Sequence, residues 1–310
     1  MPHHKVVVTG GAGFVGSHLV DRLLQDPACE VVVLDDLSRG RAANLVRHRG
    51  DPRFAFVQAD VVEPEVVAAV VRGARTVYHL AAQATVLGAT RDPGRAFRSN
   101  VVGTFTLLRA CAAASVDRLV FTSSREVYGE PIDVPVAESH PLLAINLYGA
   151  TKVAGEALCR SFRREFGLDT AILRLANVYG PRDVDRVIPL WLDLARGGVD
   201  LEVFGGKQVL DFIWVGHVVD ALIKVAKLRG AVPPINIGSG TGTPILELAR
   251  RVAHVTGSSS RVMLSAARDV EVKRFVASPE RMRELLAIEP DIDPLAHLAE
   301  LAPPRVPLPA

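Results

Sequence analysis

The sequence has little cysteine, and its three cysteines have no regular spacing. Cys29, Cys111 and Cys159 are scattered among the 310 residues and form no CxxC pair. This pattern argues against a disulfide framework and a zinc site, so we expect no bound metal and a reducing cytoplasm as the location. Long apolar runs are also missing, because none approaches the roughly 18 residues that span a bilayer. The N-terminus lacks the apolar core of a signal peptide, so no membrane partner is expected.

An excess of one sign of charge is missing as well. The chain has 36 Lys and Arg against 34 Asp and Glu, a net charge of +2, with no basic stripe or acidic tail. This balance gives no support to nucleic-acid binding. The chain does have 49% hydrophobic residues, enough to bury a sizeable core in one large domain or two modest ones.

Short β-branched runs alternate with longer helical patterns through the first half of the chain. The strand candidates are continuous apolar runs, which are typical of strands buried on both faces of a parallel sheet. The alternation predicts an α/β fold with a doubly wound sheet. Predicted strands are Val6–Thr9, Val31–Leu34, Ala55–Gln58, Thr76–Leu80, Arg118–Thr122 and Thr170–Leu175. Predicted helices are Gly16–Gln25, Ala42–Arg47, Pro64–Val71, Arg95–Ala114 and Leu147–Phe166.

The pattern becomes less regular after residue 175, where prolines and glycines interrupt it. We expect residues 1–175 to form a large domain, to which the chain returns near residues 209–237. Residues 176–310 are expected to form a smaller, interleaved domain. Predicted elements in this half are a strand at Val209–Val215, a helix near His217–Lys227, a strand at Ile235–Ile237 and a helix from Pro244 to Thr256.

A glycine-rich turn joins the first predicted strand to the first predicted helix. Gly10, Gly13 and Gly16 let the chain turn sharply and let backbone N–H groups approach a pyrophosphate, with Phe14 and Val15 between them. The helix N-terminus that follows supplies partial positive charge. This strand–turn–helix context predicts a dinucleotide site.

Two acidic residues end the second predicted strand, about 20 residues further on. A carboxylate of Asp35 or Asp36 would hydrogen-bond a ribose 2′-hydroxyl and repel a 2′-phosphate, which favours NAD over NADP. Arg39 lies close in sequence and would weaken this preference. Asp60 follows the third strand, where it either approaches the adenine or caps a turn or helix. Further cofactor contacts are expected from Val61, Leu80, Ala81, Ala82 and Thr122.

Tyr148 and Lys152 stand four residues apart in a predicted helix, so both face one side of it. A tyrosine with a pKa near ~10 is a poor base at neutral pH. A neighbouring ammonium and a positive nicotinamide ring would stabilise the phenolate, and lowering the pKa by about three units takes about 4 kcal/mol. Ser124 ends another predicted strand and is placed to hydrogen-bond the same substrate hydroxyl. The set predicts hydride chemistry at a hydroxyl-bearing carbon.

A series of motifs occurs in one order along nearly the whole chain, from Lys5 to about Leu286. They are TGGAGFVGSHL, LDDLS, HLAAQ, SNVVGT, FTSSREVYGEP, YGATK and LRLANVYGPR. In this combination the chain resembles the extended short-chain dehydrogenase/reductases, and within them the NAD-dependent epimerase/dehydratase family. The resemblance implies a Rossmann-type sheet, a smaller C-terminal substrate domain, NAD as cofactor and nucleotide-sugar chemistry. It also implies a homodimer joined by the two helices that contain Arg95–Ala114 and Tyr148–Phe166.

The resemblance also assigns roles to single residues. It makes Ser124 the catalytic Ser/Thr, Tyr148 the base and Lys152 its partner, with the last two also contacting the cofactor. It places Asn100 beside the active-site helix, among the cofactor contacts. It brings Asn177, and Arg268 in the stretch AARDVEVKRF, to the diphosphate of the substrate.

Two departures from the family pattern bear on the substrate. Leu210 stands where the family usually has an arginine that pairs with the sugar-nucleotide diphosphate. Gly216 and His217 replace an acidic pair that usually caps a helix, so we interpret this change as structural. For the missing arginine, either the substrate differs or compensation comes from Lys207, Arg182, Arg186 or Arg268.

Residues 124–128 carry the information on the reaction. Dehydratases of the family show an Asp-Glu pair here, whereas this chain has Arg125 and Glu126, so the dehydratase acid is missing. Glu126 in SxEVYG resembles the glucuronate-decarboxylating branch. Arg125 either binds a carboxylate or phosphate of the substrate, or forms an ion pair that closes the loop.

Together these residues favour a nucleotide-sugar 4-epimerase of the UDP-glucose/galactose or UDP-glucuronate type, acting through a 4-keto intermediate. The alternative within the family is a UDP-glucuronate decarboxylase or a nucleotide-sugar dehydratase, with Glu126 handling a proton. A non-enzymatic protein that merely keeps the NAD fold would have lost the catalytic Ser, Tyr and Lys, whereas this chain has all three. A simple NAD-linked dehydrogenase on the same scaffold would be distinguished by net reduction of NAD+, whereas an epimerase regenerates its cofactor.

Overall fold

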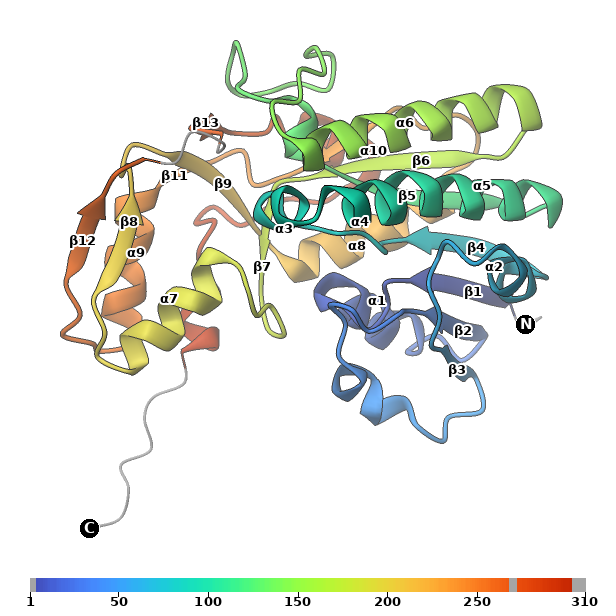
Figure 1. Ribbon diagram of the computed structural model, residues 1–310, viewed down its shortest axis with the longest axis horizontal. Coiled ribbons are helices and arrows are strands. Elements are labelled where there is room, and N and C mark those ends of the chain that lie inside the picture. Colours follow the sequence, from blue (N-terminus) through green and yellow to red (C-terminus); the bar gives the residue numbers. More distant parts are fainter. Residues whose placement is uncertain (1–3, 268–271, 303–310) are drawn as a thin grey trace.

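The largest element of the computed structural model, which describes residues 4–267 and 272–302, is a seven-stranded parallel sheet (Figure 1). Its strand order is β10-β6-β5-β4-β1-β2-β3. The order reverses between β1 and β4, and ligands of such sheets bind at the carboxyl ends of the strands beside this point. The strands are β1 (His4–Thr9), β2 (Cys29–Leu34), β3 (Phe54–Val57), β4 (Ala74–His79), β5 (Arg118–Ser124), β6 (Thr170–Leu175) and β10 (Ile235–Ile237).

Helices cover both faces of this sheet, which confirms the doubly wound, Rossmann-type α/β prediction. On one face the apolar core includes residues of α1 (Phe14–Leu23), α8 (Val215–Lys227) and α10 (Glu280–Leu286). On the other face it includes residues of α2 (Pro64–Val71), α5 (Gly103–Ala113) and α6 (Leu147–Phe166). Because both faces are covered, the middle parts of these strands are apolar on both sides, as in the valine runs at residues 6–8 and 31–33.

The helix predicted at Arg95–Ala114 is interrupted. It consists of α4 (Pro93–Phe97), a π-helical turn (Arg98–Val102) and α5. Within this stretch the Thr104 hydroxyl donates to the Asn100 carbonyl oxygen at 2.6 Å, and such side-chain bonds compete with the regular helix ladder. The segment predicted as a helix at Ala42–Arg47 is a 3₁₀ helix, η1 (Ala42–His48).

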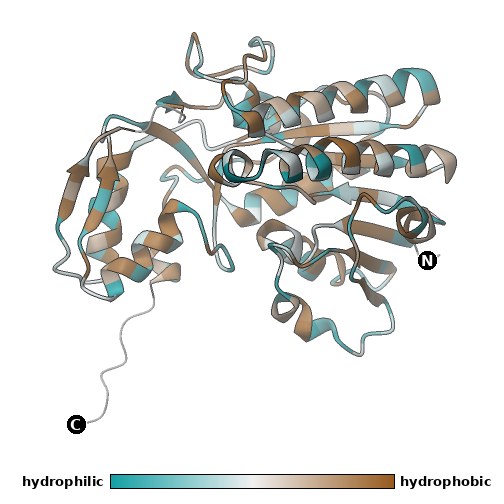
Figure 2. Cartoon of the chain, in the orientation of Figure 1, coloured by the Kyte–Doolittle hydropathy of each residue, from teal (hydrophilic) through white to brown (hydrophobic). Residues whose placement is uncertain are grey.

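A smaller unit follows β6 and packs around its own apolar core (Figures 1 and 2). One sheet contains β7 (Asn177–Tyr179), β9 (Val209–Trp214), β11 (Gly242–Pro244) and β13 (Arg274–Phe275). A second pairs β8 (Leu201–Phe204) with β12 (Val262–Ser265), beside α7 (Val187–Arg196) and α9 (Ile245–Val255). Within the expected return at residues 209–237, β9 lies in the smaller unit, whereas α8 and β10 pack with the large sheet. The exact division of the chain into domains stays a prediction.

The remaining short elements are α3 (Val86–Arg91), η3 (Arg125–Val127) and η4 (Leu298–Leu301). All three cysteines are buried and unpaired. Among residues 4–267 and 272–302, no helix combines the length and apolarity needed to cross a membrane.

Candidate active site

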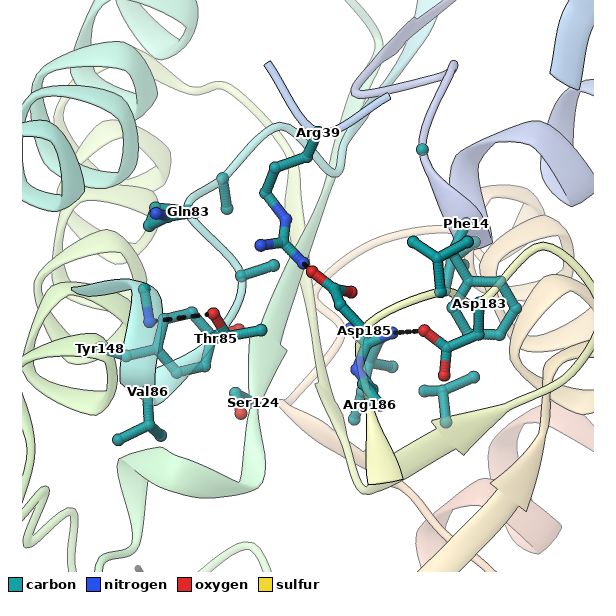
Figure 3. A pocket seen from close by; sticks show the side chains of 18 of the residues that line it. Phe14, Arg39, Gln83, Thr85, Val86, Ser124, Tyr148, Asp183, Asp185 and Arg186 are labelled. Atoms are coloured by element: carbon teal, nitrogen blue, oxygen red, sulfur yellow. Dashed lines mark hydrogen bonds and ion pairs between the residues drawn. The ribbon is translucent and has the colours of Figure 1, made fainter. Parts of the chain in front are cut away.

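A cavity of about 1180 Å³ lies between the carboxyl ends of the large sheet and the smaller unit (Figure 3). Both units contribute to its wall, as expected for a site that joins a cofactor to a substrate. Most of the predicted site residues line it, which places the cofactor and catalytic sets in one space. They are Gly10, Gly13, Phe14, Val15, Gly16, Asp35, Asp36, Asp60, Val61, Leu80, Ala81, Ala82, Thr122, Ser124, Arg125, Glu126, Tyr148, Lys152, Asn177 and Arg182.

The glycine-rich turn has no room for side chains. Gly10 has φ +73°, and a Cβ there would lie 2.6 Å from the backbone N of Ala81. A Cβ on Gly16 would lie 2.2 Å from the Gly10 carbonyl oxygen. The turn ends at Gly13, the N-cap of α1, which forms no side-chain capping bond. The first N–H groups of α1 are therefore open to the cavity, and this arrangement fits a dinucleotide pyrophosphate.

The acidic residues after β2 fit an adenosine ribose. Asp35 is buried, and its carboxylate accepts hydrogen bonds from the N–H groups of Ala12 and Leu37, both at 2.9 Å. Burial raises the pKa of Asp35. Arg39 does not pair with Asp35, because it forms an ion pair with Asp185 of the smaller unit at 2.7 Å. A 2′-phosphate would thus approach an uncompensated carboxylate, in agreement with the preference for NAD.

Asp60 and Asn100 differ in their relation to the cavity. Asp60 lines it and also closes a turn, because its Oδ1 accepts from the Val62 N–H at 3.2 Å; the N-cap of α2 is Glu63. Asn100 is buried and lies outside the lining. Its side chain accepts from the N–H of Gln83 at 2.7 Å and donates to Thr151 of α6 at 2.9 Å. Asn100 therefore ties the loop after β4 to the helix that carries Tyr148. Arg268, the other residue predicted to reach the substrate diphosphate, lies outside the described residues.

Lys152 is held at the end of β5. Its Nζ donates to the Thr122 carbonyl oxygen at 2.8 Å and lies 4.9 Å from the centre of the Phe121 ring. The ring of Tyr148 is 6.0 Å from the same Nζ. Burial lowers the pKa of Lys152 to about 8, so its proton is less firmly held than in water.

Tyr148 faces the cavity from the first turn of α6. Burial raises its pKa, while the charge of Arg186 and a hydrogen bond with Ser124 favour the phenolate. Ser124 in turn accepts from the Glu126 N–H at 3.2 Å, as the N-cap of η3. Figure 3 shows Tyr148 and Ser124 on one side of the cavity and Arg186 on the other. The sequence linked Arg186 only with phosphate, so its influence on Tyr148 emerges from the tertiary structure.

Arg125 and Glu126 form an ion pair, which is one of the two roles that the sequence predicts for Arg125. Arg125 Nη2 lies 2.8 Å from Glu126 Oε1, and the Asn146 amide donates to Glu126 Oε2 at 2.7 Å. Arg125 Nε also donates to Asn177 Oδ1 at 3.3 Å. Glu126 is buried, and both of its oxygens are engaged.

The replacements at residues 210 and 216–217 have different surroundings. Leu210 lines the cavity and adds to an apolar wall that includes Trp191 and Phe212. His217 lies 3.0 Å from the Asp291 carboxylate, away from the cavity lining. Of the four residues that could replace the missing arginine, Lys207 is not part of the cavity lining and Arg268 lies outside the described residues. The other two line the cavity. They are Arg182, paired with Asp21 at 2.6 Å, and Arg186, paired with Asp183 at 3.0 Å.

The loop between β7 and α7 is tied to the cofactor half, which the sequence did not predict. His18 Nε2 lies 2.9 Å from the Pro181 carbonyl oxygen. The Arg186 guanidinium lies 5.5 Å from the centre of the Phe14 ring. Together with the Arg39–Asp185 pair, which Figure 3 shows reaching across the cavity, these contacts place residues 181–186 over the start of α1. Partners this distant in sequence leave no local signal.

A dinucleotide turn, an acidic ribose residue and a Ser–Tyr–Lys set around one cavity define an NAD-dependent enzyme fold of the short-chain dehydrogenase/reductase class. A family model described as the NAD dependent epimerase/dehydratase family matches residues 6–238. The chain belongs to this family, as its motifs predicted, and the cofactor is NAD.

Relatives share most of the chain. A UDP-glucose 4-epimerase of Mycolicibacterium smegmatis is 36% identical over 93% of this chain and 94% of its own length. UDP-glucuronic acid decarboxylase 3 of Arabidopsis thaliana is 31% identical over 94% of this chain and 86% of its own. The crystal structure of a UDP-glucose 4-epimerase from Thermotoga maritima, with UDP-glucose, superposes with a TM-score of 0.89 at 32% identity, covering 96% of this chain and 97% of that one. Both a 4-epimerase and a decarboxylase are thus similar to this chain.

Proposed function

We propose that the protein is a nucleotide-sugar 4-epimerase that acts on a UDP-sugar through a 4-keto intermediate. The observation that carries the proposal is the cavity that Ser124, Tyr148 and Lys152 line together with the cofactor turn, where Glu126 is engaged in an ion pair with Arg125. Such a site can remove and return a proton at one carbon, and the carboxyl that stands at the position of the dehydratase acid–base pair, Glu126, is engaged by Arg125 and Asn146. The 4-epimerases among the relatives support the same reaction.

Each catalytic residue has a separate task in this reaction. When bound, NAD+ supplies a hydride acceptor that can return the hydride to the same carbon. Tyr148, as the phenolate, accepts the proton of the C4 hydroxyl, whose oxygen is held by Ser124. The ammonium of Lys152 stabilises the phenolate and is itself oriented by the Thr122 carbonyl. After the 4-keto sugar presents its other face, Tyr148 returns the proton to the C4 oxygen as the hydride returns to C4, so the reaction is redox-neutral overall.

The test is a product assay on the purified protein. UDP-glucose, UDP-galactose and UDP-glucuronate are incubated separately, and the products are followed by NMR. The expected product is the C4 epimer, without net accumulation of NADH. Absence of a C4 epimer from every member of a wider nucleotide-sugar panel would contradict the proposal.

Decarboxylation of UDP-glucuronate is the second candidate. It is favoured by Glu126 in the cavity wall and by the similarity to the Arabidopsis decarboxylase. Carbon dioxide release from UDP-glucuronate would support it over epimerisation. In that case Glu126→Gln should abolish turnover while leaving NAD bound, since the cofactor turn lies on other elements.

We further propose that the protein is a homodimer joined through α5 and α6. These helices pack side by side on the same face of the large sheet (Figure 1). Phe105 of α5 is 43% exposed and Phe166 of α6 is 61% exposed. Phe162 joins them, with ring centres 5.8 Å from Phe105 and 4.8 Å from Phe166, and a contiguous exposed apolar patch of this kind marks an interface.

A further inference from the structure

Arg125 has a buried nitrogen that lacks a hydrogen-bond partner. Nη1 is inaccessible to solvent, and no described group accepts from it, although Arg125 lines the cavity. An arginine nitrogen of this kind carries two N–H donors. Leaving such donors unsatisfied inside a protein costs free energy, which a negatively charged ligand oxygen would remove.

The rest of the side chain is fixed in place. Nε donates to Asn177, Nη2 pairs with Glu126, and the guanidinium carbon lies 5.7 Å from the centre of the Phe275 ring. The second oxygen of Glu126 is occupied by Asn146. Nη1 is therefore held in one direction before any ligand arrives, which reduces the entropy lost on binding.

The position of Arg125 connects it with the apolar substitution at Leu210. Phe275, beneath the guanidinium, is the strand partner of Leu210. Asn177 bonds Arg125 with its oxygen, while its amide donates to the carbonyl of Asp211 at 2.9 Å. Arg125 thus reaches the neighbourhood of residue 210 from η3, the turn that follows β5.

The other arginines of this part of the wall are less suited. Arg186 is already paired with Asp183, three residues before it. Arg182 also has an unpartnered Nη1, but its other nitrogen bonds Asp21 of α1, on the cofactor side. Arg125 alone among these three combines a free, buried donor with a place between Ser124 and Asn177.

We infer that Arg125 binds the diphosphate of the substrate, in place of the cation that residue 210 no longer supplies. The inference rests on the proposed nucleotide-sugar substrate. It assigns Nη1 to an anionic phosphate oxygen rather than to a carboxylate on the sugar. Arg125 is therefore a substrate-binding residue whose loss should weaken binding of the nucleotide even when no sugar is attached.

The test measures binding of UDP, dTDP and GDP, which carry no sugar, to the NAD-loaded protein by calorimetry. Arg125→Met is expected to weaken binding of the preferred diphosphate about 10- to 100-fold. Arg125→Met with Glu126→Gln avoids a buried unpaired carboxylate and should show the same loss. Arg250→Met, at an exposed position of α9 outside the cavity lining, serves as the matched control and should bind like the wild type. Adding Leu210→Arg to Arg125→Met should recover about tenfold or more of the affinity.

The outcomes separate this inference from the proposed function. Unchanged diphosphate affinity in the Arg125 variants, or a loss seen only with UDP-glucuronate, overturns the role in diphosphate binding. If the wild type binds none of the nucleoside diphosphates, both the inference and the proposed function fail. If the variants lose affinity as expected but no C4 epimer forms on any substrate, the inference stands and the epimerase proposal falls.

Discussion

Tyr148 and Ser124 show how single residues are prepared for proton transfer. The pKa of Tyr148 is raised by burial, and the groups that oppose this rise come from distant parts of the chain, β5 and the start of α7. The phenolate therefore depends on contacts that only the folded protein provides.

Tyr148→Phe is expected to lower kcat by about 10²- to 10⁴-fold, because general acid–base catalysis contributes about that much. Binding of NAD should remain, since the cofactor turn and Asp35 lie on other elements. Steady-state kinetics and calorimetric NAD titration check both parts. Retention of more than a tenth of the wild-type kcat would remove Tyr148 from the role of base.

His79 is a second residue whose surroundings determine its charge. It is buried at the end of β4 between the hydroxyls of Thr9 and Thr104, at 2.8 and 2.9 Å. Burial, assisted by the charge of Lys152, lowers its pKa from 6.5 to about 3. Below pH 6.5 the unfolded chain therefore binds a proton that the folded protein excludes.

The stability contributed by neutral His79 is present above pH 6.5 and is lost as the pH falls toward about 3. The contribution to the slope is up to about 1.4 kcal/mol per pH unit in this window. His79→Asn should flatten that part of the curve of unfolding free energy against pH. The exposed His254→Asn should leave the slope unchanged. Equal slopes in both variants would show that His79 does not control the acid limb.

At the scale of elements, α6 is fixed to the sheet by a buried ion pair. Arg174 of β6 bonds both oxygens of Glu156, at 2.9 and 2.8 Å. Ser123 of β5 donates to Glu156 at 2.7 Å. Glu156 follows Lys152 by one helical turn, so this network also sets the position of the catalytic residues.

Glu156→Gln is expected to destabilise the protein by about 3 to 5 kcal/mol, because it leaves a buried guanidinium without its counter-charge. Chemical denaturation gives the change in unfolding free energy. The exposed Glu165→Gln on the same helix should change it by less than about 0.5 kcal/mol. A small effect at Glu156 would show that the helix is held mainly by apolar packing.

At the scale of the whole molecule, the exposed phenylalanines of α5 and α6 form an apolar surface that a second subunit would cover. Phe105→Glu combined with Phe166→Glu places charge in the proposed interface and should convert a dimer to a monomer. Light scattering after size-exclusion chromatography measures the mass. Ile292→Glu, at a side chain that is 98% exposed elsewhere, should leave the mass unchanged. A monomeric wild type would contradict the dimer.

The sequence by itself determined the parallel sheet, the glycine turn with Asp35, and the shared helix face of Tyr148 and Lys152. These features depend on local periodicity and backbone conformation, which neighbouring residues encode. Helix Leu147–Phe166 and strand Thr170–Leu175 have the bounds that were predicted.

Only the tertiary structure decided that Arg125 bonds Asn177 while one of its nitrogens stays free, that Asn100 positions α6, and that Arg39 pairs with Asp185. The physical reason is that these arrangements join residues from separate strands, loops and helices. Arg39 and Asp185 are 146 residues apart, so no local pattern selects that pairing over another charge. What a side chain at the cavity binds depends on which partners the fold has already given it.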